Sequence, residues 1–250
     1  MIGIILAAGR GSRMGSLTDN QPKCLTELAG RSLLDWQLTA LGAAGIEQIV
    51  VVRGYYREAL SGPGYDVRDN ERWADSNMVV TLTAADDVLR RDDCLVSYSD
   101  IVYHPDAVCA LAADRHDVAI AYDRHWQALW QGRFEDPLAD AEIFRQRRGR
   151  LLEIGARTAR ADEIEGQYMG LLKFTPAGWQ GVSELLAGLA EAERDRLDMT
   201  ALLSRLLAAG TAIGAVAVEG SWCEVDSETD LRFYQEKIAA AEAWSHDWRW

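Results

Sequence analysis

Residues 2–25 read IGIILAAGRGSRMGSLTDNQPKCL, in which a short apolar run leads into a long, glycine-rich and basic loop. A continuous apolar run such as 2–7 is typical of a strand buried on both faces of a parallel sheet. Strand and helix patterns then alternate over about 120 residues, which predicts a doubly wound, mostly parallel mixed α/β sheet flanked by helices. Ligands of such sheets bind beyond the carboxyl ends of the strands, where this loop lies.

Apolar periodicity and turn signals predict the remaining elements. Further strands are expected at 24–28, 46–54, 65–70, 94–103, 117–123, 149–156, 168–175, 211–220 and 222–226. Helices are expected at 32–45, 55–60, 76–89, 105–113 and 227–244, and two more within 179–209. Ser32, Ser76 and Ser227 are the expected caps of three of these helices.

Composition limits the classes of partner. The chain has 250 residues, 48% of them hydrophobic, and a formal net charge of −13. An acidic surface of this size disfavours a nucleic-acid partner, because phosphates would be repelled. No apolar run is long enough for a membrane helix, and residues 2–8 are too short for a secretory signal. The four cysteines form no C-x-x-C pair, which favours reduced thiols and a cytoplasmic location.

The loop itself has the spacing Gly9-x-Gly11-x-Arg13. A dinucleotide-binding fingerprint would need glycine at Met14, so this is a different kind of anion loop. Glycines let backbone N–H groups approach phosphate oxygens closely, and arginine can bind a phosphate through two nitrogens. Lys23 is one of only three lysines in the chain, and a compact ammonium suits a point contact on a reacting phosphate. The simpler interpretation is a glycine-rich turn with incidental surface charge.

Three segments carry a family resemblance: LAAGRGSRMGSLTDNQPKCL (6–25), SYSDIVY (97–103) and WCEVDSETDL (222–231). They resemble the nucleotidyltransferase superfamily of sugar-1-phosphate nucleotidyltransferases and phosphocholine cytidylyltransferases. The resemblance implies a nucleotide-diphospho-sugar transferase-like fold. It also implies a Mg²⁺ cofactor held by Asp100 and Asp226. Each aspartate has a simpler interpretation, as a strand-end turn residue or as a helix cap.

The same resemblance assigns the catalytic and nucleotide-binding side chains. Lys23 is expected near the α-phosphate, Arg13 on the leaving pyrophosphate, and Asp100 at the metal. The full set expected to bind the nucleotide is Leu6, Ala7, Ala8, Gly9, Gly11, Arg13, Lys23, Gly54, Ser76 and Asn77.

The middle of the chain narrows the resemblance. NERWADSNMVVTL (70–82), the segments at 121–144 and 151–174, and GSWCEVD (220–226) are most similar to CTP:phosphoglutamine cytidylyltransferases, and also resemble phosphocholine cytidylyltransferases. This implies one domain over 1–250, with a nucleotide-binding half at 1–120. The half at 121–250 would hold an acceptor-binding insertion and the C-terminal helices.

The implied reaction joins CMP from CTP to a small phosphorylated acceptor and releases pyrophosphate, for modification of a capsule or surface polymer. CTP and the acceptor are the expected partners, nucleic acid and membrane are not, and a homo-oligomer is left open. Two alternatives stay open as well: an NDP-sugar pyrophosphorylase acting on a sugar 1-phosphate, and a non-catalytic nucleotide-binding regulator.

Aromatic residues recur every four positions at Tyr122, Trp126, Trp130 and Phe134. If helical, they form one stripe, which is either core or the wall of an acceptor pocket. With Trp222 and Tyr168, such a wall could form a cage for a quaternary ammonium by cation–π attraction. The expected acceptor-binding residues are Trp126, Trp130, Tyr168, Trp222 and Glu224. An amino-acid acceptor would instead need a carboxylate for its ammonium group and a cation for its carboxylate, and the nearby polar candidates are Glu163, Gln167, Arg133 and Asp136.

Overall fold

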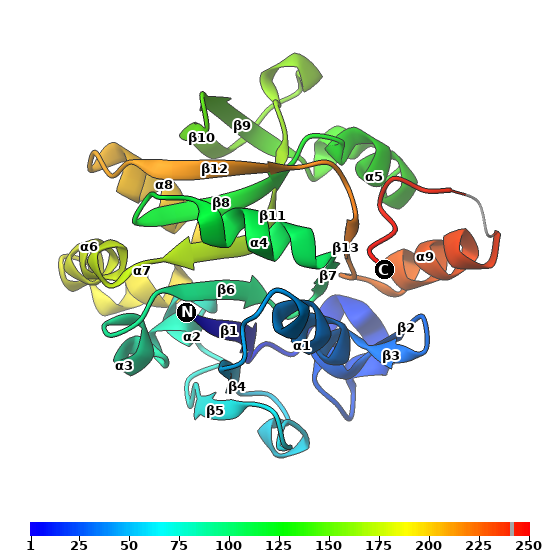
Figure 1. The fold of residues 1–250 in the computed structure, drawn as a ribbon, viewed down its shortest axis with the longest axis horizontal. Coiled ribbons are helices and arrows are strands. Elements are labelled where there is room, and N and C mark those ends of the chain that lie inside the picture. Colours follow the sequence, from blue (N-terminus) through cyan, green and yellow to red (C-terminus); the bar gives the residue numbers. More distant parts are fainter. Residues whose placement is uncertain (241–242) are drawn as a thin grey trace.

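The computed structural model describes residues 1–240 and 243–250, and its centre is a nine-stranded mixed sheet. The strand order is β5-β4-β1-β6-β11-β8-β12-β10-β9 (Figure 1). Within it β11 runs antiparallel to β6 and β8, and β10 runs antiparallel to β12 and β9. The sheet strands are β1 (Ile2–Ala7), β4 (Ile49–Arg53), β5 (Asp66–Asp69), β6 (Cys94–Tyr98), β8 (Val118–Asp123), β9 (Glu142–Arg147), β10 (Arg150–Arg157), β11 (Gln167–Phe174) and β12 (Ile213–Val218).

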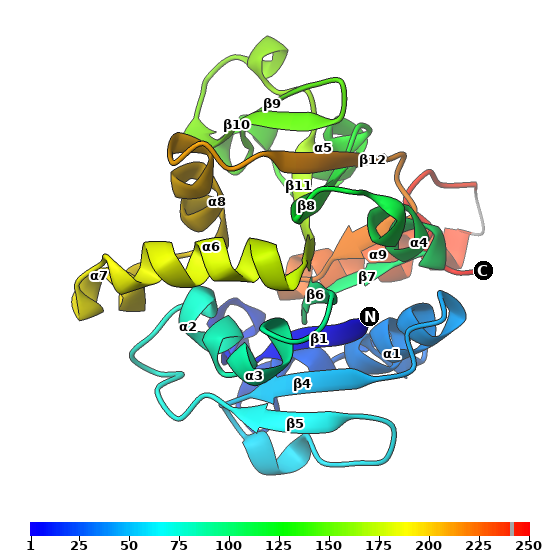
Figure 2. The same cartoon turned by 60° about the vertical axis from the view of Figure 1, so that its left-hand side comes forward.

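Helices cover both faces of this sheet, as Figures 1 and 2 show. One face packs against α1, α4, α5 and α9, and the other against α2, α3, α6 and α8. The helices are α1 (Leu33–Ala43), α2 (Met78–Thr83), α3 (Asp86–Leu89), α4 (Pro105–Ala113), α5 (Trp126–Arg133), α6 (Pro176–Ala187), α7 (Glu191–Arg196), α8 (Met199–Ala208) and α9 (Glu228–Ala240). The predicted doubly wound, mostly parallel α/β fold is confirmed.

The first strand explains why an unbroken apolar run marks the fold. Ile5 and Ala7 belong to the core on one face of the sheet, while Ile4 and Leu6 belong to the core on the other. Successive side chains of a strand point to opposite faces, so a central strand needs apolar residues at every position.

The predicted strand at 94–103 is wrong in one respect that matters for the site. It is two strands, β6 and β7 (Ile101–Tyr103), separated by a turn at Ser99 and Asp100. β7 leaves the main sheet and pairs with β13 (Trp222–Glu224), Ile101 opposite Glu224. The amide of Val225 donates to the carbonyl of Asp100 at 2.8 Å, so this small sheet brings the two halves of the chain together.

The predicted helix at 76–89 is also divided, into α2 and α3. Asn77, not Ser76, caps it, because the Asn77 side chain accepts a hydrogen bond from the amide of Met78. Ser76 Oγ instead donates to the carbonyl of Arg72 at 2.7 Å. The predicted caps Ser32 and Ser227 are confirmed by hydrogen bonds from the amides of Asp35 and Asp230.

Smaller differences lie in short segments. The predicted strand at 24–28 is a 3-10 turn, Lys23–Leu25, followed by a hairpin of β2 (Glu27–Leu28) and β3 (Arg31–Ser32). The predicted helix at 55–60 is only a 3-10 turn, Arg57–Ala59, and residues 179–209 contain parts of three helices rather than two. The strand β9 was not predicted. Residues 241–242, within the predicted helix at 227–244, lie outside the described residues.

Two expected absences concern the described residues only. No helix among them is long and apolar enough to cross a membrane. The four cysteines, Cys24, Cys94, Cys109 and Cys223, are free thiols.

Candidate active site

A cavity of about 310 Å³ lies beyond the carboxyl ends of β1 and β6. Its walls come from the loop after β1, the start of α2, the turn after β6 and the segment after β13. Most of the predicted nucleotide-binding and metal-binding residues line it. The lining residues are Leu6, Ala8, Gly9, Gly11, Ser12, Arg13, Lys23, Trp73, Ser76, Asn77, Met78, Thr81, Tyr98, Ser99, Asp100 and Asp226.

The loop after β1 is held in one conformation. Gly11 has φ of 68°, a left-handed conformation that favours glycine, and a Cβ there would lie 2.7 Å from Lys23 Cδ. Thr18 Oγ1 donates to the carbonyl of Gly11 at 3.2 Å, and the hydroxyl of Tyr55 donates to the carbonyl of Thr18 at 2.8 Å. These contacts fix the backbone amides of the loop before any anion arrives.

Lys23 lies between two carboxylates at the bottom of the cavity. Its Nζ is 2.9 Å from Asp100 Oδ2 and 2.6 Å from Asp226 Oδ1, and its side chain is only 7% exposed. Burial favours the neutral amine, but the charges of Asp100 and Asp226 outweigh it and raise the pKa of Lys23 above its ordinary value. The lysine is therefore an ammonium ion at neutral pH.

The two aspartates suit a hard cation. Asp100 Oδ1 is buried and has no hydrogen-bond partner among the described residues, and Asp226 Oδ2 pairs with Arg13. No cluster of three metal-ligating side chains occurs in the described part of the chain. Mg²⁺ is commonly bound by one or two carboxylates together with water and substrate phosphates, so a two-aspartate set fits it.

Two predicted nucleotide-binding residues do not line the cavity. Ala7 is buried in the core. Gly54 lies behind the wall, where a Cβ would be 2.5 Å from Trp73 Cβ and 2.8 Å from the carbonyl oxygen of Ala8. Its small size lets Trp73 reach the cavity. The sequence interpretation missed Trp73, Thr81 and Tyr98, which have no local signal that separates them from core residues.

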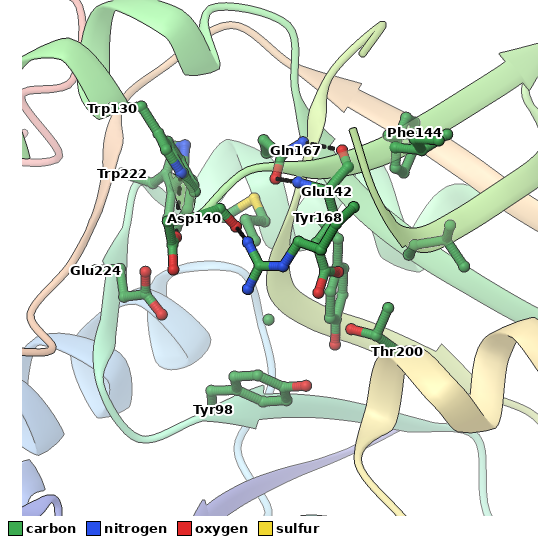
Figure 3. Close-up of a pocket in the computed structure, with 15 residues that line it drawn as sticks. Tyr98, Trp130, Asp140, Glu142, Phe144, Gln167, Tyr168, Thr200, Trp222 and Glu224 are labelled. Carbon is green, nitrogen blue, oxygen red and sulfur yellow. Dashed lines mark hydrogen bonds between the residues drawn. The ribbon is translucent and has the colours of Figure 1, made fainter. Parts of the chain in front are cut away.

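A second cavity, of about 170 Å³, adjoins the first and shares Tyr98 with it (Figure 3). Four of the predicted acceptor-binding residues line this cavity, which we call the acceptor cavity: Trp130, Tyr168, Trp222 and Glu224. Gln167 also lines it, whereas Glu163, Arg133 and Asp136 do not. The other lining residues are Tyr98, Asp140, Glu142, Ile143, Phe144, Ile154, Arg157, Met169, Gly170 and Thr200.

The aromatic stripe is not continuous. Tyr122 belongs to β8 and stacks on Phe144 with ring centroids 4.6 Å apart, and Phe134 follows the end of α5. Trp126, expected at the acceptor, is 2% exposed and packs in the core. The core interpretation holds for Trp126, while Trp130, one helical turn later, reaches the cavity.

Glu224 connects the acceptor cavity to a buried ion-pair cluster. Its Oε2 accepts from Arg133 Nη1 at 2.6 Å, and Arg133 Nε donates to Asp230 Oδ1 at 2.9 Å. Burial raises the pKa of Glu224, Arg133 lowers it, and the nearby charges of Asp100 and Asp226 raise it further, so the net direction is upward. The position of Arg133 beneath the cavity explains why it supports Glu224 rather than touching a ligand itself.

Comparisons with known proteins agree with this architecture. Residues 3–167 match the MobA-like NTP transferase domain. A CTP:phosphoglutamine cytidylyltransferase of Campylobacter jejuni subsp. jejuni is 37% identical over 256 residues, covering 95% of this chain and 100% of the relative.

Two solved structures share the fold. The inositol-1-phosphate CTP transferase from T. maritima superimposes with a TM-score of 0.74 at 18% identity, over 97% of this chain and 98% of that one. The CTP:phosphocholine cytidylyltransferase from Streptococcus pneumoniae superimposes with a TM-score of 0.74 at 19% identity, over 95% of this chain and 99% of that one. The family match and the full-length relative confirm the expected resemblance: this chain belongs to the MobA-like NTP transferase family and is a nucleotidyltransferase.

Proposed function

We propose that this nucleotidyltransferase transfers CMP from CTP to a small phosphorylated acceptor of the phosphoglutamine or phosphocholine type, and releases pyrophosphate. The arrangement that supports this most strongly is Lys23 between Asp100 and Asp226, in a cavity that meets a second, aromatic cavity at Tyr98. The name of the full-length relative supports CTP as the nucleotide.

In the proposed reaction a phosphoryl oxygen of the acceptor attacks the α-phosphorus of CTP in line. A new P–O bond forms there, the bond between the α-phosphorus and the α,β-bridging oxygen breaks, and pyrophosphate leaves with the electron pair. Because the attacking oxygen is already anionic at neutral pH, the step needs no general base. Catalysis then consists of positioning the reactants and neutralising the charge on the transferring group.

The residues of the first cavity would bind different parts of the nucleotide. Lys23 would stabilise the charge on the α-phosphate. Arg13 and the amides of Ala8, Gly9 and Gly11 would bind the β- and γ-phosphates, and Ser76 and Asn77, across the cavity, would contact the base.

We propose Mg²⁺ as the cofactor, with Asp100 and Asp226 as its protein ligands. The ion would neutralise part of the charge of the triphosphate. The unpartnered Asp100 Oδ1 supports this assignment, because a buried carboxylate oxygen without a partner is costly.

A role in the modification of a capsule or surface polymer, and a cytoplasmic location, stay predictions that rest on the sequence. The division into a nucleotide-binding half and an acceptor-binding half is likewise our proposal.

A pyrophosphate-release assay tests the function. The protein is incubated with Mg²⁺ and CTP, UTP, dTTP or GTP in turn, each with phosphoglutamine, phosphocholine, 2-aminoethylphosphonate or a sugar 1-phosphate. We expect pyrophosphate with CTP and an amino-acid or amino-alcohol phosphate. Turnover of a sugar 1-phosphate with UTP or dTTP would instead identify the protein as an NDP-sugar pyrophosphorylase. Tight CTP binding without turnover of any acceptor would favour a non-catalytic nucleotide-binding regulator.

A further inference from the structure

Arg157 reaches the acceptor cavity because of a bulge in β10. Ile154 and Arg157 both line the cavity, although residues three apart on a regular strand point to opposite faces. The register between β10 and β9 shifts between these two residues. Gly155 within the shift has φ of 96°, and a Cβ there would lie 2.5 Å from Thr200 Cγ2. Such a bulge turns a side chain to the other face, and here it turns Arg157 into the cavity.

Backbone carbonyls anchor the guanidinium of Arg157, and its charge is only partly offset by that of the neighbouring Glu142, whose pKa it lowers against the effect of burial. Its Nη1 donates to three successive backbone carbonyls, those of Ala139 at 3.1 Å, Asp140, and Ala141 at 3.4 Å. Within the described residues no carboxylate lies within 4.0 Å of it, and its Nε and Nη2 have no hydrogen-bond partner. A guanidinium held in a cavity wall, with two of its nitrogens free to donate, suits a carboxylate of the ligand.

Negative charge is in excess around Glu224. One buried cation, Arg133, forms ion pairs with two carboxylates, Glu224 and Asp230, so the cluster has one more negative than positive charge. Of the two carboxylates, Glu224 is 27% exposed and Asp230 only 4%. Figure 3 shows Glu224 beside Trp222 and Trp130, across the cavity from Thr200. A carboxylate beside two indole rings favours an ammonium group.

We infer that Arg157 binds a carboxylate of the acceptor and Glu224 binds its ammonium group, so that the acceptor is a phosphorylated α-amino acid. This inference rests on the proposed function. A quaternary ammonium acceptor would use the aromatic wall and Glu224 but would leave Arg157 without an anion. The cavity volume of about 170 Å³ is below the range of drug-sized ligands and suits an acceptor of amino-acid size.

Substrate analogues and variants together test the two contacts. The acceptors are glutamine phosphorylated on its side-chain amide nitrogen, the analogue of it that lacks the α-carboxylate and the analogue that lacks the α-ammonium, each assayed for CMP transfer from CTP. We expect Arg157→Ala to lower kcat/KM for the amino acid by about 10- to 100-fold, mostly through KM, because a charge-assisted contact is lost. The same variant should change kcat/KM for the decarboxylated analogue less than about threefold. Arg157→Lys should retain part of the activity, since lysine keeps the positive charge but lacks the paired N–H donors of a guanidinium.

Two further variants complete the design. Glu224→Gln should reduce the ratio of kcat/KM for the amino acid to that for the deaminated analogue. The ratio of kcat/KM for the amino acid to that for the decarboxylated analogue should stay unchanged. Arg150→Ala is the matched control, because Arg150 lies on the same strand but outside the acceptor cavity. It should behave like the unaltered protein with all three acceptors.

The outcomes separate the inference from the function. Equal use of the amino acid and its decarboxylated analogue by the unaltered protein would overturn the inference, as would equal losses on both acceptors in Arg157→Ala. A higher kcat/KM for phosphocholine would also overturn it. If no acceptor is turned over, the proposed function fails. Calorimetry with a non-hydrolysable CTP analogue then measures the binding of phosphorylated glutamine. Binding that is lost in Arg157→Ala and kept in Arg150→Ala supports the contact with Arg157, and binding that is kept in both variants overturns it.

Discussion

Lys23 Nζ lies 2.6 Å from Asp226 Oδ1, although 203 positions separate the two residues in the chain. The same nitrogen lies 2.9 Å from Asp100 Oδ2, so one ammonium holds both of the carboxylates that we assign to the metal. In the ligand-free protein the lysine thus neutralises charge at the point where a cation would bind. The triphosphate would have to draw Lys23 away before the metal and both carboxylates can meet.

This arrangement predicts that Lys23 competes with the metal in the absence of nucleotide. Lys23→Met should bind Mn²⁺, a spectroscopic substitute for Mg²⁺, at least about tenfold more tightly than the unaltered protein, because the loss of one ion pair is worth about 1.4 kcal/mol or more in this buried site. Electron paramagnetic resonance titration of free Mn²⁺ measures it. Lys237→Met, an exposed lysine on α9, is the control. Unchanged Mn²⁺ affinity in Lys23→Met would remove the two aspartates from consideration as the metal site.

A second prediction concerns the loop backbone. Gly11→Ala should lower the free energy of unfolding by about 1–2 kcal/mol, because its left-handed conformation disfavours a Cβ and that Cβ would meet Lys23. Gly9→Ala has open space around its Cβ and no such conformation, so its unfolding free energy should stay close to that of the unaltered protein. Urea denaturation of the ligand-free protein compares them. Equal free energies of unfolding for the two variants would contradict the prediction and show that the loop accepts a Cβ at residue 11 by changing its backbone conformation.

The buried cluster beneath the acceptor cavity predicts a larger loss of stability. Arg133→Met should lower the free energy of unfolding by about 3–5 kcal/mol, because Glu224 and Asp230 would be left buried without their shared cation. Arg124→Met removes an exposed arginine from a surface pair with Glu219 and should change stability little. If urea denaturation shows similar midpoints for both variants, the cluster does not stabilise the fold.

The pair of Asp123 and His246 predicts how stability depends on pH. His246 Nε2 lies 2.8 Å from Asp123 Oδ2, and both side chains are fully buried. Burial opposes ionisation of Asp123, but the hydrogen bond and charge of His246 outweigh it and lower the pKa of Asp123 below its usual 3.8. A lowered folded-state pKa stabilises the fold above the unfolded pKa, and this contribution is lost as the pH falls through the folded value.

The variant Asp123→Asn isolates that contribution. The difference in unfolding free energy between the unaltered protein and Asp123→Asn should be largest near neutral pH and should shrink as the pH falls below about 3.8. Urea denaturation at about pH 7 and about pH 3 measures it. A difference that grows on acidification would contradict the assigned direction of the pKa shift.

Local features of the chain were predictable from the sequence. The apolar run of β1 is recognisable from its own residues, and the glycines, Arg13 and Lys23 of the loop lie within 16 residues of its end. By contrast, the approach of Asp100 to Asp226 depends on pairing between β7 and β13, which no periodicity of either segment indicates. The resemblance supplied that pair before the fold could explain it.

The acceptor cavity shows where such interpretation fails. Regular spacing correctly placed Trp126 and Trp130 on one helix face, and both pack in the same core cluster. Only Trp130 also lines the acceptor cavity, which depends on the packing of distant elements and not on spacing. Arg157 was missed because its orientation comes from a register shift at Gly155. The register shift includes Gly155, where a Cβ would lie 2.5 Å from Thr200 Cγ2 on a distant helix, a contact that no local sequence pattern indicates.

The central claim is that Lys23 acts on the reacting phosphate, and steady-state pyrophosphate release from CTP with phosphorylated glutamine tests it most directly. Lys23→Ala should lower kcat by about 10²- to 10³-fold, the cost of removing one preorganised charge from a transition state. Lys237→Ala, the matched lysine far from both cavities, should leave kcat unchanged. A kcat in Lys23→Ala within about threefold of the unaltered protein would contradict the account.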